Sequence, residues 1–316
     1  MKYSIVIPAY KATFFRECLE SIINQTFDDY EIIVLNDCSP EGIKEIVDNC
    51  RSNTNRDIIR YYENERNVGA VDVVDNWNKL LDLSKGDYII CMGDDDKLAE
   101  DCLEQYNSLI DTYPSLDVYH GRTMMIDEKS RFCGIQEERS EWKYVYSLIW
   151  HYKFKDCVQF IGDFLFNTES LKKNGGFYKL PLAWCSDCIT SFISASSKGI
   201  ANTFYPVFYY RQNNCSITNN SSYIRLKMQA IKMYLDWMLD FLKNQPSNNI
   251  DRKYWELIKN GFENKIQHHE MYMIGNDIKN GFLNGFFYWV KHFKEYNLSW
   301  TQFCFAIGIG VAMKIR

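Results

Sequence analysis

Four short apolar runs recur in the first hundred residues, and each has the length of a β-strand. They are residues 3–8, 31–36, 57–62 and 87–92. The first, second and fourth are almost continuously apolar, as strands covered on both faces are, whereas the third is more polar. Segments with apolar residues at helical spacing separate the runs, among them residues 15–23, 40–50 and 71–83. The pattern predicts an α/β domain with a parallel sheet and right-handed crossovers.

Polar residues follow the predicted strands at the edge where such sheets bind ligands. Tyr10 comes after the first run, Asp37 after the second, and Asp94, Asp95 and Asp96 after the fourth. Three adjacent carboxylates repel one another, and a divalent cation that also binds a diphosphate relieves the repulsion. An acidic helix start is the alternative interpretation. The glycine patterns of dinucleotide-binding and P-loop proteins do not follow the first run, which argues against both classes.

Several blocks of the chain resemble the family 2 inverting glycosyltransferases with the GT-A fold. They are residues 4–10, 18–26, 30–39, 85–96, 160–177 and 208–216. The resemblance implies a Rossmann-like mixed sheet flanked by helices, as in nucleotide-diphospho-sugar transferases. It also implies a catalytic domain over residues 1–220, in which residues 1–100 hold the nucleotide-sugar and residues 101–220 the acceptor.

The resemblance assigns one set of residues to the nucleotide. They are Pro8, Ala9, Tyr10, Asp37, Asn67, Asn78, Asp95 and Arg211. In this family the segment that ends at Tyr10 packs on the base, the residue matching Asp37 reads the base, usually uracil, and the residue matching Arg211 faces the diphosphate. The donor implied is a nucleotide-sugar, typically a UDP-sugar.

The acidic triplet matches the metal-binding Asp-x-Asp signature of the family, with Gly93 in place of its first aspartate. The preferred register puts Asp96 on a Mn²⁺ or Mg²⁺ ion. Asp95 then lies near the ribose or the metal, and Asp94 is the alternative metal ligand. The cation supplies positive charge to the departing nucleoside diphosphate.

Asp187 matches the catalytic base of the family. An in-line displacement at the anomeric carbon needs a carboxylate to take the proton of the acceptor hydroxyl. The family's glutamate before this position is replaced by Ser186, and its histidine near the end of the last block by Asn213. A helix cap is the structural alternative for Asp187.

Composition and charge argue against several classes of protein and indicate a compartment. With 316 residues, 46% of them hydrophobic and 16% aromatic, the chain can bury a large core and is not disordered. Its net charge of -5 argues against a duplex-DNA binder, so we expect no nucleic-acid partner. The odd number of cysteines, 11, and the lack of a secretory signal indicate free thiols in the cytoplasm.

The last hundred residues change character. Residues 221–316 predict a helical extension that ends in aromatics, lysines and a short apolar run at 303–313. That run is too short to span a bilayer. Two interpretations stay open: peripheral contact with the inner face of the plasma membrane, or docking on the protein itself or on a second subunit as a homodimer.

We therefore expect a hexosyl- or N-acetylhexosaminyltransferase that adds one sugar to a glycan or lipid-linked oligosaccharide in surface-polysaccharide synthesis. The processive-synthase motif Gln-x-x-Arg-Trp is absent, which favours single addition. Two alternatives stay open. A sugar nucleotidyltransferase would want a basic, glycine-rich loop after the first strand. A degenerate family member would bind nucleotide-sugars without turnover, which Gly93, Ser186 and Asn213 keep open.

Overall fold

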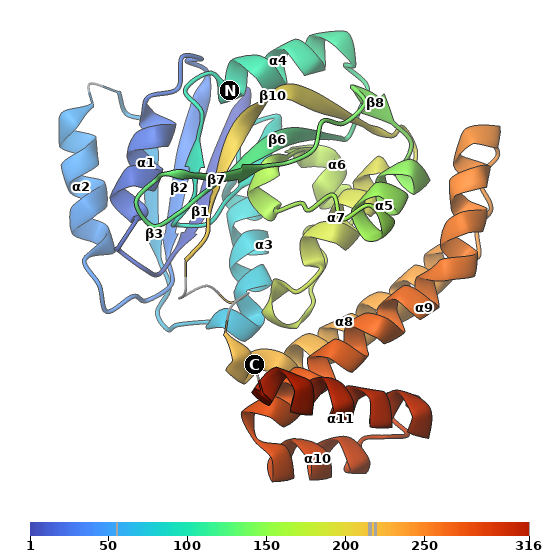
Figure 1. Cartoon of the computed structure of the whole chain (residues 1–316). Helices are drawn as coiled ribbons and strands as arrows, with labels where there is room; N and C mark the ends of the chain where they lie inside the picture. Colours follow the sequence, from blue (N-terminus) through green and yellow to red (C-terminus); the bar gives the residue numbers. More distant parts are fainter. Residues whose placement is uncertain (55, 214–216, 218–219, 316) are drawn as a thin grey trace. The chain divides into compact units, whose positions relative to one another are not determined.

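The computed structural model describes residues 1–54, 56–213, 217 and 220–315 (Figure 1). Its contacts divide these residues into two compact units. The first comprises residues 1–179 and 186–213, and the second comprises residues 180–185 and the described part of 214–316. The predicted division into a nucleotide-sugar half and an acceptor half is functional and stays a prediction.

The first unit is built on a ten-stranded sheet with the order β3-β2-β1-β4-β9-β6-β10-β5, with β7 beside β6 and β8 beside β10. Strands β1 (Tyr3–Ala9), β2 (Tyr30–Asn36), β3 (Ile59–Glu63) and β4 (Tyr88–Cys91) are parallel neighbours. They are the four apolar runs of the sequence. Their carboxyl ends therefore meet at one edge of the sheet, as predicted.

The remaining strands make the sheet mixed. They are β5 (Lys97–Leu98), β6 (Val118–Ile126), β7 (Phe132–Ile135), β8 (Trp142–Lys143), β9 (Phe164–Asn167) and β10 (Ile200–Arg211). Strand β9 runs antiparallel to both β4 and β6, while β10 runs parallel to β6 and antiparallel to β5. The predicted mixed sheet is confirmed, and β10 ends beside the start of β5 near the acidic triplet.

Helices of the first unit follow the strands that they connect. They are α1 (Phe15–Ile23), α2 (Ile43–Asn53), α3 (Val73–Leu83), α4 (Cys102–Thr112), α5 (Val145–Phe154), α6 (Thr168–Lys173) and α7 (Ser186–Ala195). Helix α1 buries Phe15, Leu19 and Ile22 on one face, as its periodicity predicts. The helix predicted from residue 40 begins three residues later, because Ser39 Oγ accepts the N–H of Glu41 (3.0 Å) and holds a turn there.

The second unit is helical, which confirms the predicted extension. It contains α8 (Ile224–Phe241), α9 (Asn249–Asn280), α10 (Phe282–Lys291) and α11 (Trp300–Ile315). Helices α9 and α11 approach closely at two glycines, since a Cβ on Gly310 would lie 2.6 Å from the carbonyl oxygen of Gly275. Among the described residues, no helix is both long and apolar enough to cross a membrane.

Candidate active site

Asp37 lies at the carboxyl end of β2 and is buried, with 6% of its surface exposed. Its Oδ1 accepts the backbone N–H of Val68 (2.9 Å) and the Asn64 amide (2.8 Å). Its Oδ2 accepts the Asn67 amide (3.2 Å) and the backbone N–H of Gly69 (3.3 Å). The structure therefore brings the predicted residues Asp37 and Asn67 together, with the carboxylate fixing the loop that carries the amide.

Asp94 ties the turn after β4 to the segment after β1. Its Oδ2 accepts the backbone N–H groups of Tyr10 and Lys11, both at 2.7 Å. Burial, followed by the charge of Asp95, raises the pKa of Asp94 to about 6. The Tyr10 side chain is 41% exposed, while Ala9 is fully buried in the strand. The predicted base-packing segment and the acidic triplet are thus adjacent.

Asp95 and Asp96 each use one oxygen to fix the turn and leave the other beside Gly93. Asp95 Oδ2 accepts the Asn213 amide (2.6 Å), and Asp96 Oδ1 accepts the backbone N–H of Arg211 (2.9 Å). A Cβ placed on Gly93 would lie 2.9 Å from Asp95 Oδ1 and 3.0 Å from Asp96 Oδ2. Burial, followed by the charge of Asp95, raises the pKa of Asp96 well above its ordinary value. Two carboxylate oxygens therefore flank one small space that a cation would neutralise.

A nucleotide-bound cation fits this pair. The described residues contain no group of three or more His, Cys, Asp or Glu side chains placed to hold a metal. Mg²⁺ and Mn²⁺ need no such group, since one or two carboxylates suffice when substrate phosphates and water supply the other ligands. Asp94 suits the ion less well than Asp95 and Asp96, because its Oδ2 already accepts two backbone N–H groups.

Arg211 is fully enclosed by protein groups. Its Nε donates to the carbonyl oxygen of Asp95 (2.8 Å), one terminal nitrogen donates to the carbonyl oxygen of Asp127 (3.1 Å), and the other pairs with Glu17 (3.0 Å). The guanidinium also lies 4.4 Å from the ring centre of Phe14. In this arrangement the side chain positions the acidic triplet, and a diphosphate contact would require some of these bonds to break.

Asn78 lies on α3 and is held to another part of the first unit. Its amide nitrogen donates to the carbonyl oxygen of Phe177 (3.0 Å), and its oxygen accepts the N–H of the same residue (2.8 Å). A Cβ on Gly176 would lie 2.4 Å from that oxygen. Two hydrogen bonds of the Asn78 amide therefore join α3 to residue 177, and its assignment to the nucleotide stays a prediction.

Asp187 lies in the first turn of α7 and is half-buried. Its Oδ1 accepts the backbone N–H of Cys188 (2.9 Å). Burial raises the pKa of Asp187 to about 6, and the charge of Asp163 contributes to the increase. A carboxylate with a pKa near neutral is well matched to general-base work. Ser186 is fully buried beside it, where the longer, charged glutamate of the family would have to be desolvated.

Asn213 and Glu17 are the site residues that the sequence reasoning underrated. The sequence marked Asn213 only as a replacement for the family's histidine, yet its amide donates a hydrogen bond to Asp95. Glu17 had no assigned role, yet it pairs with Arg211 and accepts the Ser130 hydroxyl (2.8 Å). The place of Asn213, two residues after Arg211, was the available signal, whereas nothing local marked Glu17. Residues 214–216, the end of the last resembling block, lie outside the described residues.

Comparison with known sequences identifies the family of the chain. A family model described as Glycosyl transferase family 2 matches residues 4–175, more than half of the chain. Abequosyltransferase RfbV of Salmonella typhimurium is 34% identical over 143 residues, which cover 44% of this chain and 40% of that relative. Two other curated glycosyltransferases are also 34% identical where they align, and the chain spans less than a third of the length of each.

Solved structures share the fold over most of the chain. S. aureus TarS 1–349 in complex with UDP-GlcNAc has a TM-score of 0.62 at 17% identity, covering 87% of this chain and 80% of that one. The mannosyltransferase PcManGT from Pyrobaculum calidifontis, in complex with GDP-Man and Mn²⁺, has a TM-score of 0.55 at 13% identity, covering 99% and 87%. At these identities the likeness concerns the fold alone, and it confirms the predicted GT-A fold with its C-terminal helices.

Proposed function

The chain belongs to glycosyl transferase family 2, and we propose that it is a metal-dependent, inverting enzyme that transfers one sugar from a nucleotide-sugar to a glycan or lipid-linked acceptor. The observation that carries the proposal is the pair of carboxylate oxygens, from Asp95 and Asp96, that flank Gly93 at the carboxyl edge of the sheet. The same edge presents Asp37 and the exposed Tyr10. This combination suits a base, a ribose and a metal-bound diphosphate.

The donor in this proposal is a UDP-sugar. The exposed ring of Tyr10 can stack on the base, with Pro8 and Ala9 shaping the strand end beneath it. Asp37 and Asn67 stand where the base and ribose would be read, and binding there would exchange some of the hydrogen bonds that they now share. The comparison structures hold UDP-GlcNAc in TarS and GDP-Man in PcManGT, which supports the class of donor.

The acidic turn supplies the ligands of the proposed metal ion, and neighbouring groups orient them. A bound Mn²⁺ or Mg²⁺ would stabilise the negative charge that develops on the departing diphosphate. Asp95 and Asp96 hold the ion. Asn213 and the backbone N–H of Arg211 each occupy the second oxygen of one of these carboxylates and so fix its orientation, as outer partners do in metal sites.

Asp187 is the general base of the proposed reaction. It accepts the proton of the acceptor hydroxyl as that oxygen attacks the anomeric carbon and the bond to the diphosphate breaks. A pKa of about 6 leaves the carboxylate ionised at neutral pH while keeping it more basic than an ordinary aspartate. A single displacement with one base and no covalent nucleophile inverts the anomeric configuration.

A donor screen tests the function. The full chain is incubated with Mn²⁺ and a panel of UDP-, GDP- and dTDP-sugars, and released nucleotide is measured with and without glycan acceptors. We expect Mn²⁺-dependent nucleotide release that one donor dominates. Formation of pyrophosphate would instead identify a sugar nucleotidyltransferase. Tight binding of a donor with no turnover on any acceptor would identify a degenerate, binding-only family member.

Gly93→Ala should weaken Mn²⁺-dependent UDP binding about tenfold, which corresponds to about 1.4 kcal/mol. The new methyl group would lie within 3.0 Å of both metal-facing oxygens and push them apart. The backbone of Gly93 is not in the left-handed region, so the fold should persist. Calorimetric titration of UDP with and without Mn²⁺ measures the effect, and Gly308→Ala, where a Cβ meets nothing within 4 Å, is the control. If Gly93→Ala binds UDP with Mn²⁺ as tightly as the wild type, the metal does not bind in this space.

We further propose that the second unit contacts an anionic membrane surface from the cytoplasmic side. Leu283 and Phe287 on α10 are 69% and 65% exposed, and Trp300 on α11 is 65% exposed. Between residues 282 and 315 three lysines outnumber the single acid, Glu295, which pairs with His292. Exposed aromatics beside lysines suit an anionic interface. The ten described cysteines are all free, which suits a reducing compartment.

The double variant Leu283→Ser, Phe287→Ser should bind vesicles at least about tenfold more weakly than the wild type, because two large apolar side chains leave the interface. Sedimentation with phosphatidylglycerol vesicles measures the effect. Leu257→Ser on α9, where the leucine is 49% exposed, is the control. Equal sedimentation of all three proteins would refute membrane contact, and a dimer lost in the double variant would assign α10 to a second subunit. The homodimer therefore stays a prediction.

A further inference from the structure

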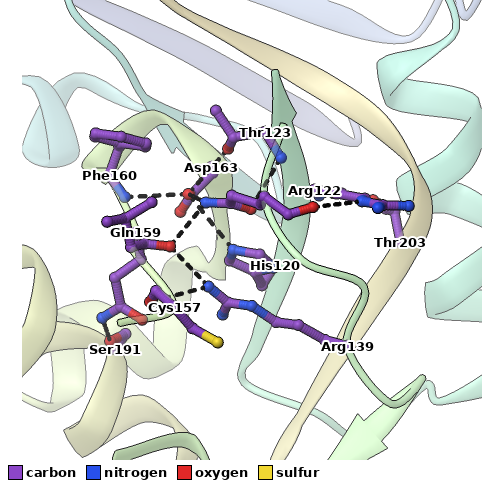
Figure 2. Close-up of polar contacts among 12 residues, drawn as sticks. His120, Arg122, Thr123, Arg139, Cys157, Gln159, Phe160, Asp163, Ser191 and Thr203 are labelled. Atoms are coloured by element: carbon purple, nitrogen blue, oxygen red, sulfur yellow. Dashed lines mark hydrogen bonds and ion pairs between the residues drawn. The ribbon is translucent and has the colours of Figure 1, made fainter. Parts of the chain in front are cut away.

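A buried polar cluster in the first unit lies outside the proposed donor site (Figure 2). Its centre is Asp163, which is fully buried. Asp163 Oδ2 accepts the Gln136 amide (2.9 Å), the Thr123 hydroxyl (3.1 Å) and the backbone N–H of Phe160 (3.0 Å). His120, 1% exposed, lies with its Nε2 3.4 Å from the same oxygen. The sequence carried no signal for this cluster.

Several polar atoms of the cluster lack partners. Four buried atoms make no hydrogen bond or ion pair within the described residues: Nδ1 of His120, Nε of Arg139, Oε1 of Gln159 and Oδ1 of Asp163. Buried polar atoms almost always have partners in proteins, supplied by the chain, by water or by a ligand. Their concentration in one place indicates that molecules other than this chain complete the cluster.

Two cations of this region lack a carboxylate partner. Arg139 donates to the carbonyl oxygens of Val158 (2.8 Å) and Cys157 (3.4 Å), as Figure 2 shows. Lys143 on β8 is 6% exposed, and its ammonium makes no hydrogen bond to the described residues. Lys143 pairs with Ile200 of β10, and Asn202, two residues further along β10, pairs with His120 of the cluster. Burial, followed by the charge of Arg139, lowers the pKa of Lys143 to about 8.

The carboxylate of Asp163 does not neutralise Arg139. The charge of Asp163 acts on Arg139, but three donors already occupy its Oδ2. Within the described residues no ion pair of 4.0 Å or less joins a carboxylate to Arg139 or Lys143. His151 supplies no negative charge, and its pKa is lowered by burial and by the charges of Lys143 and Arg139. Lys143 is buried and Arg139 is half-buried, and cations withdrawn from water are costly unless they are paired, so an anion would relieve this charge.

The cluster adjoins the proposed catalytic base. Gln159 Nε2 lies 3.5 Å from the hydroxyl of Ser191. Ser191 is four residues after Asp187 on α7, so the two side chains lie on the same face of the helix. The charge of Asp163 also contributes to the raised pKa of Asp187. An anion bound at the cations would therefore stand on the acceptor side of the reaction.

We propose that Arg139 and Lys143 bind an anionic group of the acceptor, a phosphate or a sugar carboxylate, beside Asp187. The proposal rests on the proposed function, because Asp187 marks the acceptor side only if it is the base. A guanidinium pairs with two oxygens of either anion, and an ammonium adds a point charge. The acceptor would then be a polyol-phosphate chain, a sugar phosphate or an acidic glycan rather than a neutral one.

Binding of three small probes tests the proposal: methyl phosphate, methyl β-glucuronide and the neutral methyl β-glucoside. Calorimetry uses the full chain saturated with UDP and Mn²⁺. We expect one of the anions to bind and the glucoside not to bind, which also identifies the anion. Lys143→Met and Arg139→Gln should each weaken that binding at least about tenfold, because a charge-assisted hydrogen bond is lost. Arg139→Lys should restore part of the affinity, and Lys172→Met, an exposed control on α6, should change nothing.

Two outcomes would overturn the subsite, and a third would overturn the proposed function. If neither anion binds the wild type while UDP with Mn²⁺ does bind, the subsite is wrong and the proposed function stands without it. If the anions bind Lys143→Met and Arg139→Gln as tightly as the wild type and only the unfolding temperature of these variants falls, the two cations have a structural role. If UDP and Mn²⁺ fail to bind while binding of an anion still requires both Arg139 and Lys143, the proposed function is wrong and the anion site is not an acceptor subsite.

Discussion

Asp187→Asn should lower the rate of sugar transfer by at least about a thousandfold, within the range that positioned bases contribute. Asparagine has the same shape and can still accept the N–H of Cys188, but it cannot take a proton from the acceptor. Binding of UDP with Mn²⁺ should stay within about twofold of the wild type, since the metal-facing oxygens belong to Asp95 and Asp96. Transfer rates with the preferred donor and calorimetric titration of UDP measure the two effects.

The pH profile of the wild type should report the same group. Transfer should rise as the pH passes through about 6, where the Asp187 carboxyl loses its proton, and level off above that. Because burial raises the pKa of Asp187 in the folded state, its contribution to stability is lost as the pH rises through that value. The uncharged asparagine should therefore not lower the unfolding temperature at neutral pH.

The helix-cap interpretation makes the opposite forecast. If Asp187 only stabilises the start of α7, Asp187→Asn would keep its activity and unfold at a lower temperature. Asp101→Asn, at the start of α4 and outside the site, is the matched control for a helix-start acid. If Asp187→Asn transfers sugar at the wild-type rate, Asp187 is not the general base.

Asp96→Asn should weaken Mn²⁺-dependent UDP binding at least about a hundredfold, or about 2.8 kcal/mol. The amide oxygen can still accept the backbone N–H of Arg211, so the turn is kept while the charge is lost. Since burial raises the pKa of Asp96 well above its ordinary value, removing this charge should not destabilise the fold at neutral pH. Titration of UDP with Mn²⁺ and with EDTA separates the metal-dependent part.

Asp94→Asn distinguishes the two registers of the acidic triplet. Asp94 Oδ2 accepts hydrogen bonds from the backbone N–H groups of Tyr10 and Lys11, and an asparagine oxygen can accept the same bonds. We expect it to retain most of the Mn²⁺-dependent binding. If instead Asp94→Asn loses that binding and Asp96→Asn keeps it, the metal belongs to Asp94, and the orientation of the turn described here is wrong.

The position of the site followed from local patterns. Short, continuous apolar runs separated by helical segments are typical of strands covered on both faces, and parallel strands bring their carboxyl ends to one edge. The residues after those runs, Tyr10, Asp37 and Asp94, therefore had to meet, and they do. The helix at α2 was placed less well, since the turn made by Ser39 depends on a side-chain hydrogen bond that periodicity does not register.

Side-chain partners did not follow from local patterns. Gly93 suggested a missing ligand, whereas its lack of a side chain is what leaves room between the oxygens of Asp95 and Asp96. Arg211 suggested a free cation for the diphosphate, whereas it is buried against Glu17, which lies on α1 at the other end of the domain's sequence. Asn213 suggested a weakened contact, whereas it orients Asp95.

The sequence by itself determined the family, the order of the first four strands and the helices between them, and the edge of the sheet where the acidic residues lie, because these depend on hydrophobic period and on local spacing. Only the tertiary structure decided which oxygens of Asp95 and Asp96 face Gly93, that Arg211 is enclosed, and that Lys143 is buried without an ion pair to a described carboxylate. The physical reason is that hydrogen bonds and burial are set by segments distant in the chain. Whether a charge is paired or exposed is therefore settled only when those segments pack.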